Sequence, residues 1–497
     1  MSTPITVLGI DLGTSSVKVV LTDPAGNVLT QAAADYPVDR PHPGWAETDP
    51  ERWWQAVRAA VAQVLDAVPG AEPAGIGLSG QMHGVVLCTA DGIAVRPAVL
   101  WADARAEAEL NIYRALPEAT RARLANPLSP GMAGPELAWL HRHEAGVVGR
   151  ARWALQPKDW IRARLTGEFA AEPSDASATL LYDVLGQNWD REVVAALGIR
   201  AELLPPLLPF AGTIAGHLQP TAAQELKLAA GIPVAAGAGD SAAAALGSGV
   251  LEPGTIQLTI GTGVQIVTVM PTPTADSVGH RHDPVTHLYR SATRDSWYAM
   301  AAGLTGGQTL DWVRRLLGAD WAELYAAADR GPRDDDPIFL PHLIGERTPY
   351  LDTQLRGSWT GLDPRHDRAA LLYSALEGVA FAAADGLDAL PGVPAADRRL
   401  RLAGGGTASP GWRALLANVL DAELHAVDVP GASARGAALL AAQAAGLLTE
   451  TDLAQVARPH TTMIAAPGPG VAALQQRRRL YLNTLRALRP LRSQASR

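Results

Sequence analysis

The sequence predicts an α/β protein built as two similar halves. Hydrophobic residues make up 47% of its 497 residues and charged residues 19%, which is the balance of a folded chain of roughly three average domains or two large ones. Strand-like and helix-like runs alternate throughout. A strand, a Gly-Thr turn and a returning strand occur around Thr14 and again around Thr262, and 262 − 14 = 248 is almost half the chain length. This spacing predicts a duplicated domain.

The first half opens with strands and then a long helix. Apolar, mostly β-branched runs separated by turn residues predict strands over 5–10 and 17–21 and a third from Val28. Asp49-Pro50 has the pattern of a helix cap followed by proline in the first helical position, and apolar residues at helical spacing continue to Pro69. Residues 75–79 then predict a buried strand.

The second half repeats the pattern. Residues 255–260 and 264–269 predict two strands around the turn Gly261-Thr262-Gly263. Ser409-Pro410 predicts the start of one helix, and the Ala/Leu-rich stretch 436–445 predicts another. The small residues at 247–249 favour a boundary there, so we expect domains over 1–248 and 249–497.

Composition excludes several classes of protein. A formal charge of −8 disfavours nucleic acid and anionic membranes as partners, and we interpret the basic run 477–479 as a solvated helix face. Cys88 is the single cysteine, which rules out an intrachain disulfide. The first residues lack the pattern of a signal peptide, so we expect a cytoplasmic protein without a membrane segment. The sequence leaves a homodimer open.

Two glycine-threonine turns are candidates for binding phosphate. In the segment 11–16, Gly13 allows close backbone approach, hydroxyl groups follow it, and Asp11 can hold a hydrated metal ion. Alone, this pattern is better explained by an ordinary hairpin turn with solvated hydroxyl groups. The matching turn at 261–263 favours two hairpins that grip a nucleotide from both sides of a cleft. No Walker A sequence is present.

A further glycine cluster, 404–406, follows a predicted strand and precedes the helix at Ser409. It is either an ordinary strand-to-helix loop or a flat surface for an adenine and its ribose, with a helix N-terminus nearby.

Asp240 stands alone among small residues where an apolar strand ends. It can cap the helix of alanines that follows. It can also be the general base that accepts a hydroxyl proton in phosphoryl transfer, and both uses are compatible.

Polar and aromatic residues end two more strand-like runs, Gln81-Met82-His83-Gly84 and Trp101-Ala102-Asp103. Either run can be purely structural. Together they offer donors, acceptors and a flat ring, which suit a polyhydroxylated ligand.

In their order and spacing these segments resemble the FGGY family of carbohydrate kinases along nearly the whole chain, and within that family the kinases of D-xylulose. The similar segments are GIDLGTSSVK (9–18), RPHPGWAETDPERWW (40–54), GLSGQMHG (77–84), LQPKDWIRARLTGEF (155–169), GAGDSAA (237–243), FLPHLIGERTPY (339–350), ALEGVAFA (375–382) and LAGGGTASPGWR (402–413).

The resemblance implies two actin-like (ribonuclease H-like) domains that close on ATP, Mg²⁺ and a sugar. The first domain would carry the sugar pocket and one phosphate hairpin, the second would bind the nucleotide, and the last helix would pack back on the first domain. The implied catalytic residues are Asp240, as base, and Asp11, near the metal. The implied sugar contacts are Met82, His83, Trp101, Asp103 and Asp240. The implied nucleotide contacts are Gly13, Thr14, Ser15, Lys18, Gly261, Thr262, Gly405 and Gly406.

This chain departs from the family pattern at several positions. The family usually has P-K-x-x-W where this chain reads Pro135-Glu136-Leu137-Ala138-Trp139. Members that phosphorylate D-xylulose commonly have W-N-D, D-N and G-T-S at 101–103, 240–241 and 261–263, and an arginine or lysine follows their glycine loop in place of Thr407. These changes affect the sugar pocket more than the base or the phosphate turns.

We therefore expect an ATP-dependent kinase that makes D-xylulose 5-phosphate from D-xylulose. The alternatives are a related kinase for D-ribulose, L-xylulose or a glycerol-like polyol, and a non-catalytic actin-like ATP-binding protein. A chaperone-type ATPase would need a further peptide-binding domain, for which the two halves leave no room.

Overall fold

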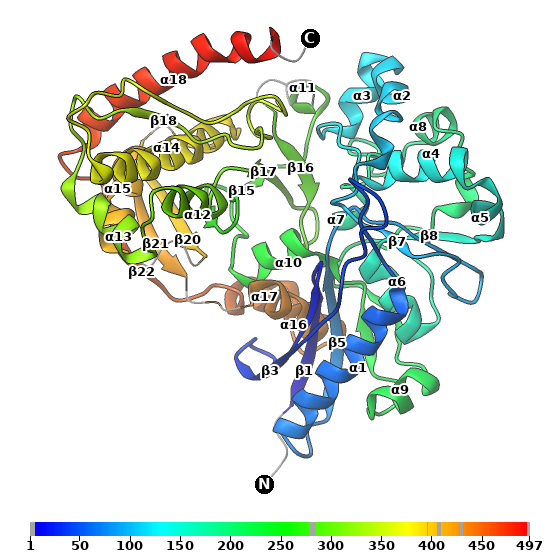
Figure 1. Ribbon diagram of the computed structural model, residues 1–497. Helices are drawn as coiled ribbons and strands as arrows, with labels where there is room; N and C mark the ends of the chain where they lie inside the picture. The colour runs from blue at the N-terminus through cyan, green and yellow to red at the C-terminus, as the bar shows by residue number, and fades with distance from the viewer. Residues whose placement is uncertain are drawn as a thin grey trace.

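The computed structural model describes residues 5–278, 285–394, 396–404, 409–427, 429 and 431–494. Two mixed β-sheets, one in each half of the chain, lie beside each other with helices around them (Figure 1). The predicted α/β class is therefore confirmed.

The first sheet has the strand order β11-β12-β5-β1-β2-β3, with β13 paired to the end of β5. Its central strand β1 is antiparallel to β2, with Asp11 opposite Lys18, and parallel to β5. The strands are β1 (Thr6–Leu12), β2 (Ser16–Thr22), β3 (Val28–Asp35), β5 (Pro73–Gly80), β11 (Ile214–His217), β12 (Pro233–Ala235) and β13 (Ala238–Gly239).

The second sheet has the order β16-β17-β15-β14-β20-β21-β22. Here β14 is antiparallel to β15 and parallel to β20. The strands are β14 (Ile256–Ile260), β15 (Val264–Met270), β16 (His287–Arg290), β17 (Trp297–Gly303), β20 (Arg398–Ala403), β21 (Ala422–Val427) and β22 (Thr461–Ala465).

The two sheets match strand for strand. In each, an antiparallel hairpin leads to two parallel strands and a final antiparallel one, so that β1, β2, β3 and β5 correspond to β14, β15, β17 and β20. The predicted duplication is confirmed, and the arrangement is the one expected of two actin-like domains.

Local sequence explains where the main elements begin. The carboxylate of Asp49 accepts a hydrogen bond from Glu51 N at 3.0 Å, and Pro50 is the first residue of α1 (Pro50–Ala67), as predicted. Ser409 caps α15 (Pro410–Leu420) through Trp412 N in the same way. The buried strands β1 and β14 supply the apolar residues on which these helices and their neighbours pack.

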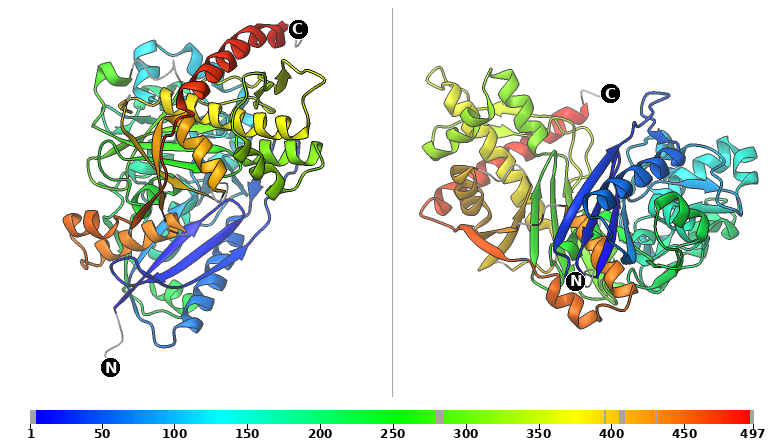
Figure 2. Two further views of the ribbon diagram at one scale, coloured as in Figure 1. Left: turned by 90° about the vertical axis from the view of Figure 1, so that its left-hand side faces the viewer. Right: turned by 90° about the horizontal axis from the view of Figure 1, so that it is seen from below.

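The remaining helices surround the two sheets and complete the outer layers (Figure 2). In the first half they are α2 (Leu110–Ala115), α3 (Glu118–Leu124), α4 (Ala133–His143), α5 (Ala145–Arg150), α6 (Pro157–Thr166), α7 (Pro173–Ala176), α8 (Arg191–Ala196), α9 (Pro220–Leu226) and α10 (Asp240–Gly247). In the second half they are α11 (Ala275–Val278), α12 (Gly307–Leu316), α13 (Trp321–Ala326), α14 (Arg368–Ala389), α16 (Ala432–Ala444), α17 (Glu450–Val456) and α18 (Val471–Gln494). Short strand pairs join β4 (Glu47–Thr48) with β7 (Ala98–Val99), β6 (Val86–Cys88) with β8 (Trp153–Leu155), β9 (Tyr182–Asp183) with β10 (Asn188–Trp189) and β18 (Ile338–Leu340) with β19 (Ser358–Thr360).

Helix α16 belongs to the second half of the chain but packs on the sheet of the first half, against β1 and β5, and it crosses α10 (Figure 1). The contact is between backbones. A Cβ atom on Gly77 of β5 would come within 1.9 Å of Ala437 O, and one on Gly436 would come within 2.0 Å of Ala243 O in α10. Only glycine lets these backbones approach so closely. The division at residue 248 thus stays a prediction, because a helix from beyond it completes the first domain's core.

The last helix does not follow its expected course. The contacts of α18 are with α14, α15 and β18 of the second half. Arg477, predicted to lie on a solvated face, is only 4% exposed and binds both carboxylate oxygens of Glu377 at 2.6 and 2.7 Å. The prediction for this basic run was wrong at Arg477, because a buried carboxylate on α14 pairs with it.

One helix among the described residues, α14, has the length and apolar composition needed to cross a membrane. Most of it is buried in the core of the second half.

Replacing Gly77 with alanine tests the close packing of α16 on β5. The new methyl group would overlap the backbone of α16, so we expect the variant to lose about 1–3 kcal/mol of unfolding free energy, the usual cost of overpacking a core. Denaturant unfolding measures this change. Gly149→Ala is the matched control, since a Cβ there meets no atom within 4 Å and alanine favours the helix. Equal stability of Gly77→Ala and the wild type would mean that α16 is not held as closely as described.

Candidate active site

A polar cavity of about 340 Å³ lies between the two halves and is lined by residues of both. The first half contributes Met82, His83, Trp101, Asp240 and Ser241. The second half contributes Thr259, Gly261, Thr262, Gly263, Val264, Gln265, Met300, Ala302, Gly303 and Arg347. Five residues that the sequence singled out as sugar or nucleotide contacts and that come from distant segments, Met82, His83, Trp101, Gly261 and Thr262, therefore meet in one cavity with Asp240.

Asp240 is the first residue of α10 and follows β13 directly. Gly239 occupies the cap position of α10, so Asp240 lies in the first turn of the helix and is not its cap residue. Burial raises the pKa of Asp240 to about 7, the nearby charge of Asp11 adds to this, and hydrogen bonds from Ser241 oppose it. The carboxyl group therefore titrates near neutral pH.

A fully buried polar network lies beneath Asp240. The Gly239 amide donates to Ser174 Oγ at 3.0 Å, and that hydroxyl donates to Glu172 Oε1 at 2.7 Å. Lys158 Nζ lies 3.2 Å from the same Glu172 oxygen and also pairs with Asp159 and Asp175. These bonds hold the strand that ends at Asp240. The sequence indicated Lys158, Asp159 and Gly239 only as part of family-like segments, and Glu172, Ser174 and Asp175 lie outside those segments.

The first phosphate hairpin is the turn between β1 and β2. Gly13 N donates to Ser16 O at 2.9 Å, which closes the turn, and Ser15 is exposed at its tip. Thr14 Oγ1 accepts a hydrogen bond of 2.9 Å from Trp101 Nε1. This bond joins the hairpin to a segment predicted to contact sugar.

Asp11 ends β1 beside this turn. Burial raises the pKa of its carboxyl group, while the hydrogen bond from Ser79 Oγ (2.8 Å) and the charge of Lys18 oppose that rise. Among the described residues no three His, Cys, Asp or Glu side chains gather in a group that could hold a metal ion. A metal ion near Asp11 would thus need few protein ligands, which is usual for Mg²⁺.

The second phosphate hairpin joins β14 and β15 and is supported by the start of α12. Gly307 N donates to Gly261 O at 2.8 Å, and Gln308 N donates to Thr262 O at 3.1 Å. Gly404 approaches the same end of β14, where a Cβ would come within 2.4 Å of Ile260 O. The predicted nucleotide contacts Gly405 and Gly406 lie outside the described residues.

His83 has a defined protonation state and orientation. Its backbone is in the left-handed region, with φ of 76°, and its Nδ1 lies 2.7 Å from Ala178 O. Burial lowers the pKa of His83 to about 4, so the ring is neutral at pH 7. Because a carbonyl oxygen only accepts, the proton is on Nδ1 and Nε2 is left as an acceptor. Met82 packs behind it, where a Cβ on Gly239 would come within 2.9 Å of Met82 Cγ.

Asp103 was expected to contact sugar, and the structure does not support this. Its side chain is buried, and its oxygens accept hydrogen bonds from Ala46 N (2.7 Å) and from the Arg105 guanidinium (2.7 and 2.9 Å). Arg105 in turn lies over the Trp45 ring. The carboxylate is used inside the first half and does not line the cavity.

The sequence analysis missed several residues of the cavity wall. Gln265 Nε2 donates to Ser241 Oγ at 3.3 Å and thus connects the second half to the neighbour of Asp240. Arg347 reaches the cavity from the segment 345–350, which was noticed only for its family resemblance. The sequence offered one indication that Gln265 and Arg347 belong to a site, namely that each lies in or within a few positions of a recognised motif.

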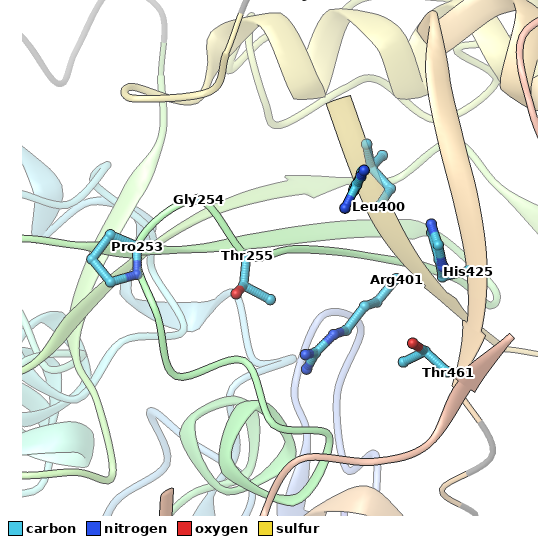
Figure 3. A pocket seen from close by; sticks show the side chains of 8 residues that line it. Pro253, Gly254, Thr255, Leu400, Arg401, His425 and Thr461 are labelled. Carbon is cyan, nitrogen blue, oxygen red and sulfur yellow. The ribbon is translucent and has the colours of Figure 1, made fainter. Parts of the chain in front are cut away.

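Another cavity, of about 400 Å³, lies beside the second sheet near Thr255, Arg401, His425 and Thr461 (Figure 3). Among the described residues, no carboxylate lines it. Arg401 Nη1 donates to the carbonyl oxygens of Ser248 and Gly249 at 2.7 and 2.5 Å, so its charge holds the connection between α10 and β14. We therefore place the chemistry in the cavity at Asp240.

Comparison with known proteins gives matches over most of the chain. The model of the N-terminal domain of the FGGY family of carbohydrate kinases matches residues 6–247, and that of the C-terminal domain matches residues 257–445. Xylulose kinase of Klebsiella pneumoniae is 34% identical over 98% of this chain and 100% of its own length. Xylulose kinase of Escherichia coli is 35% identical over 96% and 99%.

Solved structures agree with these matches. The crystal structure described as a xyloylose kinase from Brucella ovis has a TM-score of 0.90 and 34% identity, and covers 98% of this chain and 100% of its own. The xylulose kinase structure from Rhodospirillum rubrum has a TM-score of 0.88 and 28% identity over 98% and 100%. From these matches and the cavity between its two actin-like halves, the chain belongs to the FGGY family of carbohydrate kinases and is an ATP-dependent sugar kinase.

Proposed function

We propose that this kinase phosphorylates D-xylulose to D-xylulose 5-phosphate, with Asp240 as the general base. The observation that carries the proposal is the position of Asp240, whose carboxyl group lines one cavity with His83 on one side and the Gly261–Gly263 turn on the other. The names of the similar proteins, xylulose kinases at 34–35% identity, support this choice of sugar.

The reaction needs a base that is ionised near neutral pH and only weakly solvated. In the proposed step Asp240 accepts the proton of the sugar's terminal hydroxyl group, the hydroxyl oxygen bonds to the γ-phosphorus of ATP, and the bond from that phosphorus to the leaving ADP oxygen breaks. A pKa of about 7 suits this exchange, because the group is then present as carboxylate and is still basic enough to take the proton.

Backbone amides and hydroxyl groups of the two hairpins would neutralise charge on the phosphates. Thr14 and Thr262 carry those hydroxyl groups, and the amides at the start of α12 hold the second hairpin in place by donating to Gly261 O and Thr262 O.

The site's charge fits Mg²⁺. Asp11 and Asp240 lie close enough for the Asp11 charge to raise the pKa of Asp240, and a divalent cation would relieve that repulsion. Asp11 would hold the ion through water, and the ion would neutralise charge on the ATP phosphates when bound.

His83 would orient the sugar through its free Nε2, which can accept a hydrogen bond from a hydroxyl group. Met82 would give the carbon chain an apolar surface, since it is 4% exposed at the cavity wall.

The proposal is tested first by assaying ATP consumption and sugar phosphate formation with D-xylulose, D-ribulose, L-xylulose and glycerol. The highest kcat/KM is expected with D-xylulose. A higher value with another of these compounds would overturn the sugar assignment, and ATP hydrolysis that no sugar stimulates would overturn the kinase reaction itself.

Asp240→Asn should separate catalysis from stability. Asparagine cannot accept the proton, so kcat should fall by at least about 10²-fold.

The same variant tests the raised pKa of Asp240. In the folded protein Asp240 keeps its proton up to about pH 7, whereas in the unfolded chain it loses the proton near pH 3.8. The unfolding free energy of the wild type therefore falls as pH rises from about 4 to 7. In Asp240→Asn this fall is absent, because asparagine does not titrate. We expect a higher Tm than that of the wild type at pH 8, with the difference vanishing towards pH 4.

Asp334→Asn is the control for this variant, because Asp334 is exposed on a loop. It should change neither kcat nor the pH dependence of Tm. Turnover close to the wild-type value in Asp240→Asn would remove Asp240 from the role of base.

His83→Ala should weaken sugar binding specifically. We expect kcat/KM for D-xylulose to fall by about 5–20-fold, the value of one hydrogen bond and its orientation, while the KM for ATP stays within about twofold. Steady-state kinetics with each substrate varied in turn measures this split. His217→Ala, an exposed histidine on β11, is the control, and an equal rise in the KM for ATP would show that His83 does not serve the sugar alone.

Sugar and nucleotide should bind cooperatively, because the cavity's walls come from both halves and each ligand favours their approach. Coupling of 1–3 kcal/mol is usual, so saturating D-xylulose should improve the affinity for a non-hydrolysable ATP analogue by roughly 5–150-fold, and the reverse should hold equally. Calorimetry measures both, and small-angle scattering should show a smaller radius of gyration with both ligands. Identical affinities and no compaction would exclude closure.

A further inference from the structure

Arg347 lies in the wall of the Asp240 cavity and comes from the second half of the chain. Its loop is tied to the end of β17. Thr348 N donates to Ala302 O at 3.1 Å, and Ala302 N donates to Thr348 Oγ1 at 3.1 Å. Ala302 and Gly303 line the same cavity, so the backbone that carries Arg347 is fixed at the cavity's edge.

The guanidinium group of Arg347 has no carboxylate within 4.0 Å in the described parts of the chain. The neighbouring Glu346 is used elsewhere, since its oxygens accept hydrogen bonds from Leu304 N (2.6 Å) and Arg347 N (2.9 Å) and lie 3.3 Å from His342 Nδ1. By contrast, the buried Arg105 is held by Asp103 and Glu47. Arg347 thus brings a charge and several donors to a polar cavity without a partner acid.

Apart from Glu346, the titratable side chains that interact with Arg347 are neutral. Burial keeps the pKa of His83 at about 4 and that of His287 at about 3, and the charge of Arg347 lowers both further. Tyr289 is buried between these groups, and neither its hydroxyl group nor His287 Nδ1 has a hydrogen-bond partner among the described residues. The guanidinium group of Arg347 therefore lies within electrostatic reach of His83, a residue proposed to contact the sugar, and an oxygen atom of a ligand would satisfy its donors.

Arg347 and Asp240 line this cavity from opposite halves of the chain. Among the described residues they do not form an ion pair within 4.0 Å. A ligand whose terminal hydroxyl group lies at Asp240 would therefore reach Arg347 with a more distant part of its carbon chain.

The chemistry of the proposed substrate identifies that part. A 2-ketopentose can close a five-membered ring only by adding its C5 hydroxyl group to the C2 carbonyl. That hydroxyl group is the one to be phosphorylated, so the ring form cannot react. A kinase for this position must bind the open-chain ketone, and the C2 carbonyl oxygen, three carbons from C5, is a strong acceptor for a charged donor.

We propose that Arg347 donates a hydrogen bond to the C2 carbonyl oxygen of the open-chain sugar and is thereby the residue that selects a ketose. This inference rests on the proposed function. Arg347 would favour the reactive open chain over the closed ring, and it would discriminate against a polyol, whose carbon at this position carries a hydroxyl group in place of the carbonyl.

The experiment compares D-xylulose with xylitol, which has the same carbon chain and terminal hydroxyl groups but no carbonyl group. We would measure kcat/KM for both sugars in the wild type, Arg347→Met and Arg347→Lys. In Arg347→Met we expect the value for D-xylulose to fall by about 10–100-fold, the usual effect of losing a charged hydrogen bond, and the value for xylitol to change by less than about threefold. Lysine should restore part of the preference for D-xylulose.

The controls separate this proposal from others. Arg365→Met removes a surface arginine whose side chain is 72% exposed and should change neither value. Calorimetric dissociation constants of the two sugars give the same ratio if xylitol turnover is too slow to measure, and thermal melting checks that Arg347→Met is folded. Equal losses on both sugars, or a raised KM for ATP, would overturn the proposal and place the guanidinium group on the phosphates.

Failure of the proposed function has a different signature. If the wild type prefers another ketose, the function is wrong, and the same comparison is then made between that ketose and the polyol obtained by reducing it. An unchanged ratio of the two kcat/KM values in Arg347→Met would overturn the present inference whichever ketose is preferred.

Discussion

The contact between α10, α16 and the first sheet is the constraint on which the rest of this structure depends. At Gly9, Gly77, Gly247 and Gly436 a Cβ atom would come within 1.9–2.2 Å of a carbonyl oxygen of the facing element. Backbones packed at this distance leave little freedom to shift, because protein interiors do not deform continuously. Since α10 begins at Asp240, this packing also fixes where the candidate base lies.

Near the start of α10 lie charged groups that no neighbouring side chain of opposite charge neutralises. Asp240 and Asp11 are carboxyl groups with raised pKa values, and Arg347 is a guanidinium group without an acid partner within 4.0 Å among the described residues. Elsewhere several buried charges are paired, as Arg477 is with Glu377. Unpaired buried charge costs stability. Its concentration in one cavity is what a site needs if ligands are to supply the missing partners.

The sequence predicted the fold well wherever local rules decide the structure. The hairpin turns, the caps at Asp49 and Ser409 and the duplicated strand order all follow from period, turn residues and spacing. It failed where long-range pairing decides. Arg477 had no visible partner 100 positions away, and the destination of α16 depends on glycines in strands more than 350 residues earlier.

The residues of the candidate site also fall into two groups, those that local sequence predicts and those that long-range contacts decide. Glycines, threonines and Asp240 were found because their chemistry is tied to a local turn or strand end. Asp103 does not line the cavity, and its partner Ala46 N, 57 positions away in the sequence, becomes visible only when the segments meet. Arg347 and Gln265 were missed because nothing in their own neighbourhood shows that they face a cavity whose other wall is formed by the first half of the chain.

The C-terminal end of α10, the helix that carries Asp240, is attached to the connection between the two halves. Arg435 Nη1 binds the carbonyl oxygen of Gly247 at the end of α10, and Arg401 binds those of Ser248 and Gly249. Both arginines satisfy carbonyl groups that a helix end leaves unpaired, and their charge suits that end of the helix dipole. The C-terminal end of the helix that carries Asp240 is therefore held by arginines of α16 and β20, and just before its other end the Gly239 amide donates to Ser174 Oγ. A closing movement of the halves would bring the second hairpin and Arg347 towards Asp240. In such an arrangement Arg347, which we propose binds the sugar's carbonyl group, would move with the second half of the chain, which carries the second hairpin. A correct sugar would then complete the site only as the cavity closes.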